Sequence, residues 1–560
     1  MSPQKQVLII GGVAGGMSCA TRLRRLDETA KITVIERGPY VSYANCGIPY
    51  ALGGVVDGEG KLHVQTVDKM KRWFNIDART NMELTSIQRA ERKAKIRDRS
   101  TGLEFFVPYD KLVLALGAEA FVPPIQGADA EHVFPLQTIP NLQEIQATIA
   151  EKGCRRAAVI GGGFIGLEAA ENLSRLGLEV TIFEFDQHVF PLVDPEIGQV
   201  VDAELRKNGV NLRLNARVTK IGGPSESHSG LVFAQGQDPV PADLVIMAVG
   251  IRARTAIAKE AGLAVGKAGV SVNEFMQTSD PDIYAVGDMV ETLNLVTGAP
   301  MQTALAGPAN RQGRLVADHI SGKEVKYRGN LGASVCQVFG KTVGIVGLST
   351  RNLDRLGIKH EYVTVHPPHH AGWYPGASPV TIKVAFEVPS GKLLGAQVIG
   401  NEGVDKRIDV LATAMRAGMT IEDLEHLELA YAPPYGAAKD AINMAGFVGG
   451  NVVRGDVKLV HTVDFVRGAR KLEDFQVIDV RGPEEYGKGH LKGAKNIPLV
   501  SLRERVGEME KGVPTLVHCK SGYRSYVGYR ILAQNGVDVY NLDGGFKSVL
   551  DGGYITIQES

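Results

Sequence analysis

Cys46 lies in the turn-rich stretch Ser42–Tyr50, where a glycine and a proline favour a loop. Ala51 stands five positions further on, so no neighbouring cysteine can close a local disulfide with Cys46. A thiolate carries two electrons only by bonding to another sulfur or to oxygen. Cys46 is therefore a candidate redox centre whose partner is a thiol brought from elsewhere, or an oxygen. The alternative is a packed, inert cysteine.

Cys519 has a different setting, at the end of the run Thr515–His518 and with four residues between it and Arg524. The segment predicts a tight loop leading into a helix, where backbone N–H groups and Arg524 would stabilise a thiolate. A protein tyrosine phosphatase also combines cysteine, loop and arginine, but with five intervening residues. The shorter loop suits a terminal sulfane sulfur rather than a phosphate. The alternative is an inactive binding version of the same loop.

The composition narrows the classes of protein that these cysteines serve. The 560 residues exceed what one core holds and predict about three to four domains. Lys plus Arg equals Asp plus Glu, 62 against 62, so no global field favours nucleic acid or an anionic membrane. The 5 scattered cysteines argue against a disulfide framework and for a reducing compartment. Without a signal-peptide or membrane-length apolar run, we expect a soluble cytoplasmic protein.

The elements that must position the cysteines begin with the apolar run Val7–Ile10, the turn Gly11–Gly16 and a helix-spaced stretch. This order predicts a strand, a phosphate-binding turn and a helix whose N-terminus favours a pyrophosphate. Glu36 ends the next predicted strand, twenty residues after Gly16, where it would bind a ribose hydroxyl. Val13 replaces the middle glycine of this fingerprint, which weakens the signal and leaves a structural turn as the alternative.

A second, cleaner copy consists of the strand Ala157–Ile160, the turn Gly161–Gly166, a helix and a strand that ends at Glu184. Two such units predict two dinucleotides. Glu184 would accept hydrogen bonds from ribose hydroxyls and repel a 2′-phosphate, which predicts NADH rather than NADPH.

From Leu331 the pattern changes to strands such as Val380–Phe386, followed by helices expected to begin at Val404 and Ile421. A charged connector follows Asn451, and a small α/β unit then contains Cys519. The loop histidines of the middle region lack a cysteine or carboxylate at ligand spacing, so no metal site is expected and they are interpreted as polar loop groups. These histidines are His366, His369 and His370.

The stretch around Cys46 resembles the signature of coenzyme A disulfide reductases and their persulfide-reducing relatives, in which a lone cysteine forms a mixed disulfide with coenzyme A. The two Gly-rich units, the segments Leu114–Ala118 and Ala248–Gly250, and the run Asp282–Asp288 resemble the two-dinucleotide flavoproteins. The last segment, with Asn541–Gly545, resembles a rhodanese domain.

The resemblance implies an α/β architecture and a homodimer. Its domains would be a Rossmann-like FAD domain at 1–120 and 250–325, a Rossmann-like NAD domain at 121–249, an α+β dimerisation domain at 326–450, a linker at 451–468 and a rhodanese domain at 469–560.

The resemblance also implies residue roles. FAD would contact Gly11, Ala14, Gly15, Gly16, Glu36, Arg37, Ala115, Gly117, Asp288, Ala306 and Tyr431. NAD would contact Gly161, Gly163, Phe164, Ile165, Gly166, Glu184 and Gly250. Coenzyme A or the substrate would contact Arg22, Arg25, Ser42, Asn45, Lys71, Asn310, Arg311 and Lys439. Of these, Asn310 and Lys439 would come from the other subunit, and Lys69 and Arg72 are alternatives to Lys71. The catalytic residues would be Cys46, Tyr374, Tyr431, Cys519 and Arg524.

The implied function is an FAD-dependent NADH oxidoreductase that reduces persulfides, polysulfides or coenzyme A disulfide to thiol and hydrogen sulfide through Cys46. Cys519 would handle sulfane sulfur, and Tyr374 and Tyr431 of the other subunit would donate protons unless they only pack the interface. The rivals are plain coenzyme A disulfide reduction, an NADH oxidase with a sulfenic Cys46, and a sulfur-carrier hub with a redox-sensing flavin.

Overall fold

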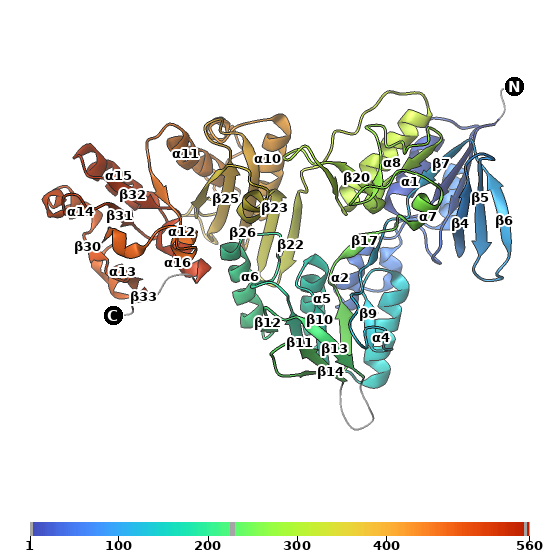
Figure 1. The fold of residues 1–560 in the computed structure, drawn as a ribbon, viewed down its shortest axis with the longest axis horizontal. Coiled ribbons are helices and arrows are strands. Elements are labelled where there is room, and N and C mark those ends of the chain that lie inside the picture. The colour runs from blue at the N-terminus through green and yellow to red at the C-terminus, as the bar shows by residue number, and fades with distance from the viewer. Residues whose placement is uncertain (1–3, 224–229, 554–556, 559–560) are drawn as a thin grey trace. The chain divides into compact units, whose positions relative to one another are not determined.

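The computed structural model describes residues 4–223, 230–553 and 557–558 (Figure 1). The chain falls into two compact units, Met1–Phe183 with Ala216–Asn330, and Glu184–Asn215 with Leu331–Ser560. Among the described helices, none is long and apolar enough to cross a lipid bilayer.

The first unit contains a sheet of five parallel strands in the order β19-β7-β1-β2-β3. These strands are β1 (Gln6–Ile10), β2 (Lys31–Ile35), β3 (Asp77–Arg79), β7 (Lys111–Leu114) and β19 (Ile283–Ala285). Their residues are largely buried apolar side chains, as expected for a parallel sheet covered by other elements. The Gly-rich turn leaves the carboxyl end of β1, in the middle of this sheet.

Helices α1 (Ala14–Arg24) and α8 (Ala306–Ile320) pack closely against each other beside this sheet (Figure 1). The approach depends on small residues, since a Cβ on Gly313 would lie 2.0 Å from the carbonyl oxygen of Gly15. An antiparallel sheet of β4 (Met82–Gln88), β5 (Lys93–Asp98) and β6 (Glu104–Pro108) contacts β1 and β2.

A second parallel sheet in the first unit has the order β11-β10-β16-β9. Its strands are β9 (Val133–Pro135), β10 (Arg156–Ile160), β11 (Glu179–Phe183) and β16 (Leu244–Met247). The associated helices are α4 (Ile139–Lys152) and α5 (Phe164–Arg175), and the antiparallel pair β8 (Ala118–Ala120) and β17 (Ile251–Ala253) connects the two sheets' chain segments. The two α/β halves confirm the predicted pair of Rossmann-like folds.

The second unit begins with α6 (Pro195–Lys207) and contains an antiparallel sheet in the order β22-β23-β26-β25-β24. Its strands are β22 (Ser334–Val338), β23 (Lys341–Gly347), β24 (Glu361–Val365), β25 (Val380–Phe386) and β26 (Leu393–Gly400), with α10 (Val404–Ala417) and α11 (Ala441–Val453) packed on them. The helix expected from Ile421 is only the single turn Asp423–His426. The long helix instead begins at Ala441, where Asp440 accepts a hydrogen bond from the Ile442 amide.

The C-terminal sheet of the second unit is parallel, in the order β27-β32-β31-β28-β30. Its strands are β27 (Leu459–Val460), β28 (Gln476–Asp479), β30 (Lys495–Asn496), β31 (Thr515–His518) and β32 (Val539–Leu542), with helices α15 (Tyr523–Gln534) and α16 (Gly545–Gly552). The segment 451–468, expected as a charged connector, contains the end of α11, β27 and α12 (Thr462–Val466). It is a built part of the fold because Leu459 and Val460 pair with β32.

His461 lies between the antiparallel sheet and the C-terminal domain. Its Nε2 is 2.6 Å from Glu361 Oε1, its Nδ1 is 3.4 Å from Asp543 Oδ2, and its ring stacks on Tyr362 at 3.8 Å. Burial opposes the charged imidazolium, but the two carboxylates outweigh burial and raise the pKa of His461 to about 10. A buried cation thus joins the two domains.

We expect this cation to make stability depend on pH. A group whose pKa rises on folding stabilises fully below its unfolded pKa of about 6.5, and this stabilisation is lost as pH rises through the folded value. His461→Gln should therefore lower the Tm at pH 6.5 by on the order of 5 °C, with a smaller difference from wild type as the pH approaches 10. Thermal melts of both proteins at several pH values test this, and a pH-independent difference would contradict it.

Candidate active site

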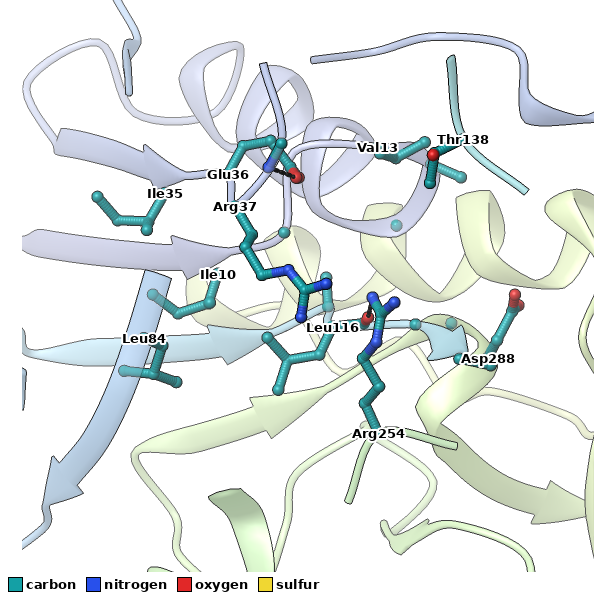
Figure 2. Close-up of a pocket in the computed structure, with 18 of the residues that line it drawn as sticks. Ile10, Val13, Ile35, Glu36, Arg37, Leu84, Leu116, Thr138, Arg254 and Asp288 are labelled. Carbon is teal, nitrogen blue, oxygen red and sulfur yellow. Dashed lines mark hydrogen bonds between the residues drawn. The ribbon is translucent and has the colours of Figure 1, made fainter. Parts of the chain in front are cut away.

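A pocket of about 480 Å³ opens at the first Gly-rich turn (Figure 2). The predicted FAD contacts that line it are Gly11, Ala14, Gly15, Glu36, Arg37, Ala115, Gly117 and Asp288. Gly16 and Ala306 do not line it, and Tyr431 belongs to the second unit. The pocket thus brings together segments that lie far apart in the chain, from Ile10 to Ala309.

The turn needs glycine where the backbone approaches itself. A Cβ on Gly11, whose φ is +108°, would lie 2.1 Å from the carbonyl oxygen of Ala115. One on Gly16 would lie 1.9 Å from the carbonyl oxygen of Gly11. Val13 has φ −108° as the N-cap of α1 and lines the pocket, so its side chain is accommodated. The missing middle glycine therefore leaves the strand, turn and helix intact.

Glu36 follows β2, and two backbone donors fix its carboxylate. Its Oε2 accepts a hydrogen bond from the Gly12 amide at 2.7 Å, and its Oε1 accepts one from the Gly38 amide at 2.7 Å. The acid therefore lies at the carboxyl end of the strand, where a ribose is bound in a dinucleotide fold.

Arg254 is a pocket residue that the sequence interpretation missed. Figure 2 shows the guanidinium groups of Arg37 and Arg254 both pointing into the pocket. Arg254 Nη1 donates a hydrogen bond to the Leu116 carbonyl at 3.1 Å, which aims the side chain. Two cations near a helix N-terminus suit the two phosphates of FAD. A lone arginine after a short strand carries no sequence signal for this position.

Two further polar groups lie in the same pocket. Burial and the charge of Glu36 raise the pKa of Tyr43 to about 12, although Arg254 acts in the opposite direction, so the phenol stays protonated. Asp288 lies in a turn whose Gly287 amide donates to Gln312 Oε1 at 2.7 Å, and burial raises the pKa of Asp288. With the Gly-rich turn, Glu36 and the two arginines, these residues fit FAD, which supplies two-electron transfer when bound.

Cys46 lies in the single turn Asn45–Gly47 and is exposed. Its sequence neighbours Tyr43 and Asn45 line the FAD pocket, whereas Cys46 itself is not a lining residue. Among the described residues, no cysteine is in a disulfide. The inert, packed alternative does not agree with this exposure.

The short helix α2 (Ile48–Leu52) that follows Cys46 packs against α5 of the second parallel sheet. Tyr50 donates its hydroxyl to Glu168 Oε1 at 3.1 Å, and burial raises the pKa of Glu168. Glu168 was not predicted from the sequence. Its place in the helix after the second Gly-rich turn is the only signal that could have suggested it.

The second Gly-rich turn repeats the geometry of the first. A Cβ on Gly161 would lie 2.4 Å from the Ala248 carbonyl oxygen, and one on Gly166 would lie 1.9 Å from the Gly161 carbonyl oxygen. Gly163 is the N-cap of α5, and Phe164 and Ile165 form its first turn. This helix N-terminus is suited to the phosphates of a nicotinamide dinucleotide.

Glu184 directly follows β11 and is buried. Its Oε1 accepts a hydrogen bond from the Asp186 amide at 2.8 Å, and its own amide donates to the Arg213 carbonyl at 2.9 Å. The carboxylate is thus held at the carboxyl end of the strand, as the sequence predicted for a ribose contact. Gly250, another predicted NAD contact, begins the β17 crossing with φ +111°.

The predicted coenzyme A ligands of the first unit differ in whether their cationic groups are already paired with a carboxylate. Arg22 Nη2 lies 2.7 Å from Asp318 Oδ1, so this guanidinium is already paired. Arg25 is exposed and donates to the Thr21 carbonyl at 3.0 Å, and Lys71 on α3 (Val67–Phe74) donates to Asn75 at 2.9 Å, so neither is paired with a carboxylate of the described residues. Arg25 and Lys71 are therefore the better-placed cations for a polyanion.

The remaining predicted ligands of this unit are polar residues near Cys46 or on α8. Ser42 has φ +46°, in the bend before Cys46. Asn310 Oδ1 accepts a hydrogen bond from the Ser18 hydroxyl, which joins α8 to α1, and Arg311 beside it is exposed.

In the second unit, the loops that carry Tyr374 and Tyr431 lie together, because the Ala371 amide donates to the Gly436 carbonyl at 2.8 Å. Tyr374 is 37% exposed and Tyr431 is 50% exposed. The buried Arg407 anchors both loops through Asp440 at 2.7 Å and the His369 carbonyl at 2.7 Å. Lys439, the predicted coenzyme A ligand, is exposed beside Asp440.

Cys519 is only 1% exposed, at the end of β31 and before the N-terminus of α15. Its sulfur accepts a hydrogen bond from the Gly522 amide at 3.2 Å and one from the Ser525 hydroxyl at 3.4 Å. Backbone and hydroxyl donors thus converge on the sulfur, as expected for a stabilised thiolate. The loop from Cys519 to Ser525 is called the Cys519 cradle below.

Arg524 is paired with Glu485 through two hydrogen bonds of 2.6 and 2.8 Å. The hydrogen bonds that Arg524 donates to Glu485 are the main cause of its raised pKa, and the charge of Cys519 adds to it. Arg524 therefore stabilises the cradle electrostatically while its fork is occupied by a carboxylate.

Three family models match the chain. The pyridine nucleotide-disulphide oxidoreductase model matches residues 5–306, the dimerisation domain of the same family matches 334–442, and the rhodanese-like domain matches 463–551. These matches agree with the two α/β halves, the antiparallel sheet and the C-terminal parallel sheet.

Two curated relatives cover 79% of the chain. An NADH oxidase from Methanocaldococcus jannaschii is 35% identical over 97% of its own length, and a coenzyme A disulfide reductase from Staphylococcus haemolyticus is 33% identical over 99%. Two solved structures cover nearly the whole chain. Reduced Bacillus anthracis CoADR-RHD is 42% identical with TM-score 0.95, covering 99% of both chains. An NAD-dependent persulfide reductase from A. fulgidus is 37% identical with TM-score 0.90, covering 97% of this chain and 99% of its own.

The FAD pocket, the second dinucleotide turn and the exposed Cys46 thus occur together with family matches over most of the sequence. The chain belongs to the pyridine nucleotide-disulphide oxidoreductase family, whose FAD- and NAD(H)-dependent oxidoreductase core is followed here by a dimerisation domain and a rhodanese-like domain.

Proposed function

We propose that this protein is an NADH-dependent reductase of persulfides, polysulfides or coenzyme A persulfide and disulfide, acting as a homodimer. The observation that carries the proposal is the exposed Cys46, which forms no disulfide and directly follows Asn45 of the FAD pocket. A thiol without an internal partner must form its sulfur–sulfur bond with the substrate. Similarity to a coenzyme A disulfide reductase and to a persulfide reductase supports the same class of substrate.

The overall reaction balances as R–S–SH + NADH + H⁺ → R–SH + H₂S + NAD⁺. Cys46 thiolate attacks one sulfur of the persulfide bond, and the other sulfur leaves with a proton. The resulting disulfide at Cys46 is then reduced by two electrons that originate from NADH. In our proposal Tyr374 and Tyr431 of the partner subunit donate protons.

The other residues of the first unit hold the reactants. Arg25, Lys71 and Arg311 meet the phosphates of coenzyme A, while Ser42 and Asn45 lie beside Cys46. Glu168, held by Tyr50, lies on the helix that follows the second Gly-rich turn, and we assign it to the nicotinamide side of the flavin.

Cys519 prepares the sulfur. Its thiolate attacks the sulfane sulfur of a donor, and the donor leaves as a thiolate. The new Cys519 persulfide then transfers its terminal sulfur to an acceptor thiol such as coenzyme A, which regenerates the Cys519 thiol. No net electrons are transferred in this step, so it needs no reductant.

The test is steady-state NADH oxidation by the full-length holoenzyme with coenzyme A persulfide, coenzyme A disulfide, polysulfide or oxygen as the only acceptor. We expect persulfide to give the highest kcat/KM, with one hydrogen sulfide formed per NADH oxidised. Faster turnover with oxygen and no hydrogen sulfide would overturn the proposal. That outcome would favour the second candidate, an NADH oxidase, which the M. jannaschii relative supports.

The preference for NADH over NADPH is expected to depend on Glu184. Its buried carboxylate would repel a 2′-phosphate, which costs roughly a few kcal/mol at reduced dielectric. The wild type should favour NADH by kcat/KM, and Glu184→Ala should narrow this preference by about tenfold or more. Glu184→Gln keeps the hydrogen-bonding shape and serves as the matched variant. A wild-type preference for NADPH would contradict the assignment.

A further inference from the structure

The backbone directly behind the Cys519 cradle contains two consecutive glycines, Gly544 and Gly545, each with φ +64°. A Cβ on Gly545 would lie 2.7 Å from the Cys519 carbonyl oxygen and 2.9 Å from the amide nitrogen of Gly522. The Phe546 amide donates to that same Cys519 carbonyl at 2.8 Å. The loop 543–548 is therefore the floor of the cradle, and its position decides where the sulfur-binding amides point.

The dimerisation domain holds this floor from the other side. The Thr364 amide at the end of β24 donates to Asp543 Oδ1 at 2.9 Å. His366 Nε2 lies 3.0 Å from the Ser548 hydroxyl, and a Cβ on Gly544 would lie only 3.0 Å from the same nitrogen. Thr364 in β24 and His366 just after it therefore contact the first and last residues of the floor, Asp543 and Ser548.

His366 itself is held in one orientation. Its Nδ1 lies 2.9 Å from the Thr381 hydroxyl on β25, so its two ring nitrogens bridge the sheet and the floor of the cradle. Burial and the charge of Lys547 lower the pKa of His366 to about 3, so the ring is neutral and one nitrogen donates while the other accepts. His366 therefore acts as a neutral, fixed hydrogen-bonding group between Thr381 and Ser548.

We propose that His366, from the dimerisation domain, is a positioning residue of the sulfur-transfer site in the rhodanese-like domain. The His366 ring holds Ser548 and Gly544 in place. The next residues of the floor, Gly545 and Phe546, contact the backbone of Cys519 and so fix its position. The sulfane site is thus built by two domains, and the sequence interpretation of His366 as a mere polar loop group is incomplete. This inference rests on the proposed role of Cys519 as a sulfur acceptor.

The full-length holoenzyme with His366→Ala tests the proposal. Two readouts on Cys519 are used: the pH dependence of its alkylation by iodoacetamide, and the rate at which thiosulfate adds 32 Da to its peptide by mass spectrometry. In that reaction the thiolate takes the outer sulfur of thiosulfate and sulfite leaves. We expect the alkylation midpoint to move to higher pH and sulfur loading to slow by about tenfold, with NADH reduction of the flavin unchanged.

His360→Ala is the matched control, because His360 precedes β24 and its Nδ1 is paired with the Ile358 carbonyl rather than with the cradle. Thr381→Val removes only the second partner of the His366 ring and should give a smaller shift of the same sign, which preserves the test where His366→Ala folds poorly. An unchanged alkylation profile in Thr381→Val and in folded His366→Ala would overturn the proposal. A third outcome separates the two proposals. If the wild type gains no sulfur but His366→Ala still shifts the alkylation profile of Cys519, the proposed role of Cys519 is refuted and the positioning role of His366 is supported.

Discussion

Replacing Cys46 by serine is expected to lower NADH-dependent persulfide turnover by about a thousandfold or more, because the hydroxyl cannot form the required sulfur–sulfur bond. The variant should still bind FAD, since the contacts of that pocket come from Glu36, Arg254 and the Gly-rich turn rather than from the thiol. NADH should therefore still bleach the flavin absorbance at close to the wild-type rate. Stopped-flow reduction and steady-state persulfide kinetics measure the two effects separately.

Cys154→Ser is the matched control for this experiment. Cys154 lies in the first unit just before β10, outside both Gly-rich turns, and its Sγ donates to the Thr148 carbonyl. Its replacement should leave both rates unchanged. Persulfide turnover by Cys46→Ser at near wild-type rates would show that another thiol carries the electrons, and the central assignment would fail.

Replacing Cys519 by serine is expected to lower the rate of NADH oxidation with bulky or highly charged sulfur donors, which cannot reach Cys46, by about a hundredfold or more. Small persulfides that reach Cys46 directly should be spared. The reason lies in the cradle, where the Gly522 amide and the Ser525 hydroxyl converge on a sulfur that is almost completely buried. Only a terminal sulfur of a donor fits such a site, so we expect Cys519 to accept sulfur before it reaches Cys46.

Kinetics with polysulfide, a small-molecule persulfide and coenzyme A persulfide separate the possibilities. A loss with polysulfide alone supports the upstream role. Equal losses with all three would show an obligatory relay and contradict the direct access of small persulfides to Cys46. Unchanged rates with all three would leave the rhodanese-like domain without a catalytic part. Ser521→Ala controls for disturbance of the loop, because Ser521 belongs to the same loop while the donors to the sulfur are Gly522 and Ser525.

Much of this protein was readable from local sequence. The Gly-rich turns were found because the backbone approaches itself so closely at Gly16 and Gly166 that a Cβ cannot fit. Val13 weakened the first signal, yet its φ of −108° lies outside the left-handed region, so the position needs no glycine. The spacing of Cys519 and Arg524 likewise predicted a small loop before a helix, which the structure has at α15. Such features depend on neighbours in the chain, so the sequence alone determines them.

Other features were decided only by tertiary structure. Arg254 enters the FAD pocket from a strand crossing, Glu168 meets Tyr50 across 118 residues, and His366 meets Ser548 across 182 residues. Within the expected connector at 451–468, Leu459 and Val460 form strand β27 because β32, about eighty residues later, pairs with them. No local periodicity records such encounters. They follow from which surfaces the folded sheets and helices bring together, and local sequence patterns do not predict these contacts.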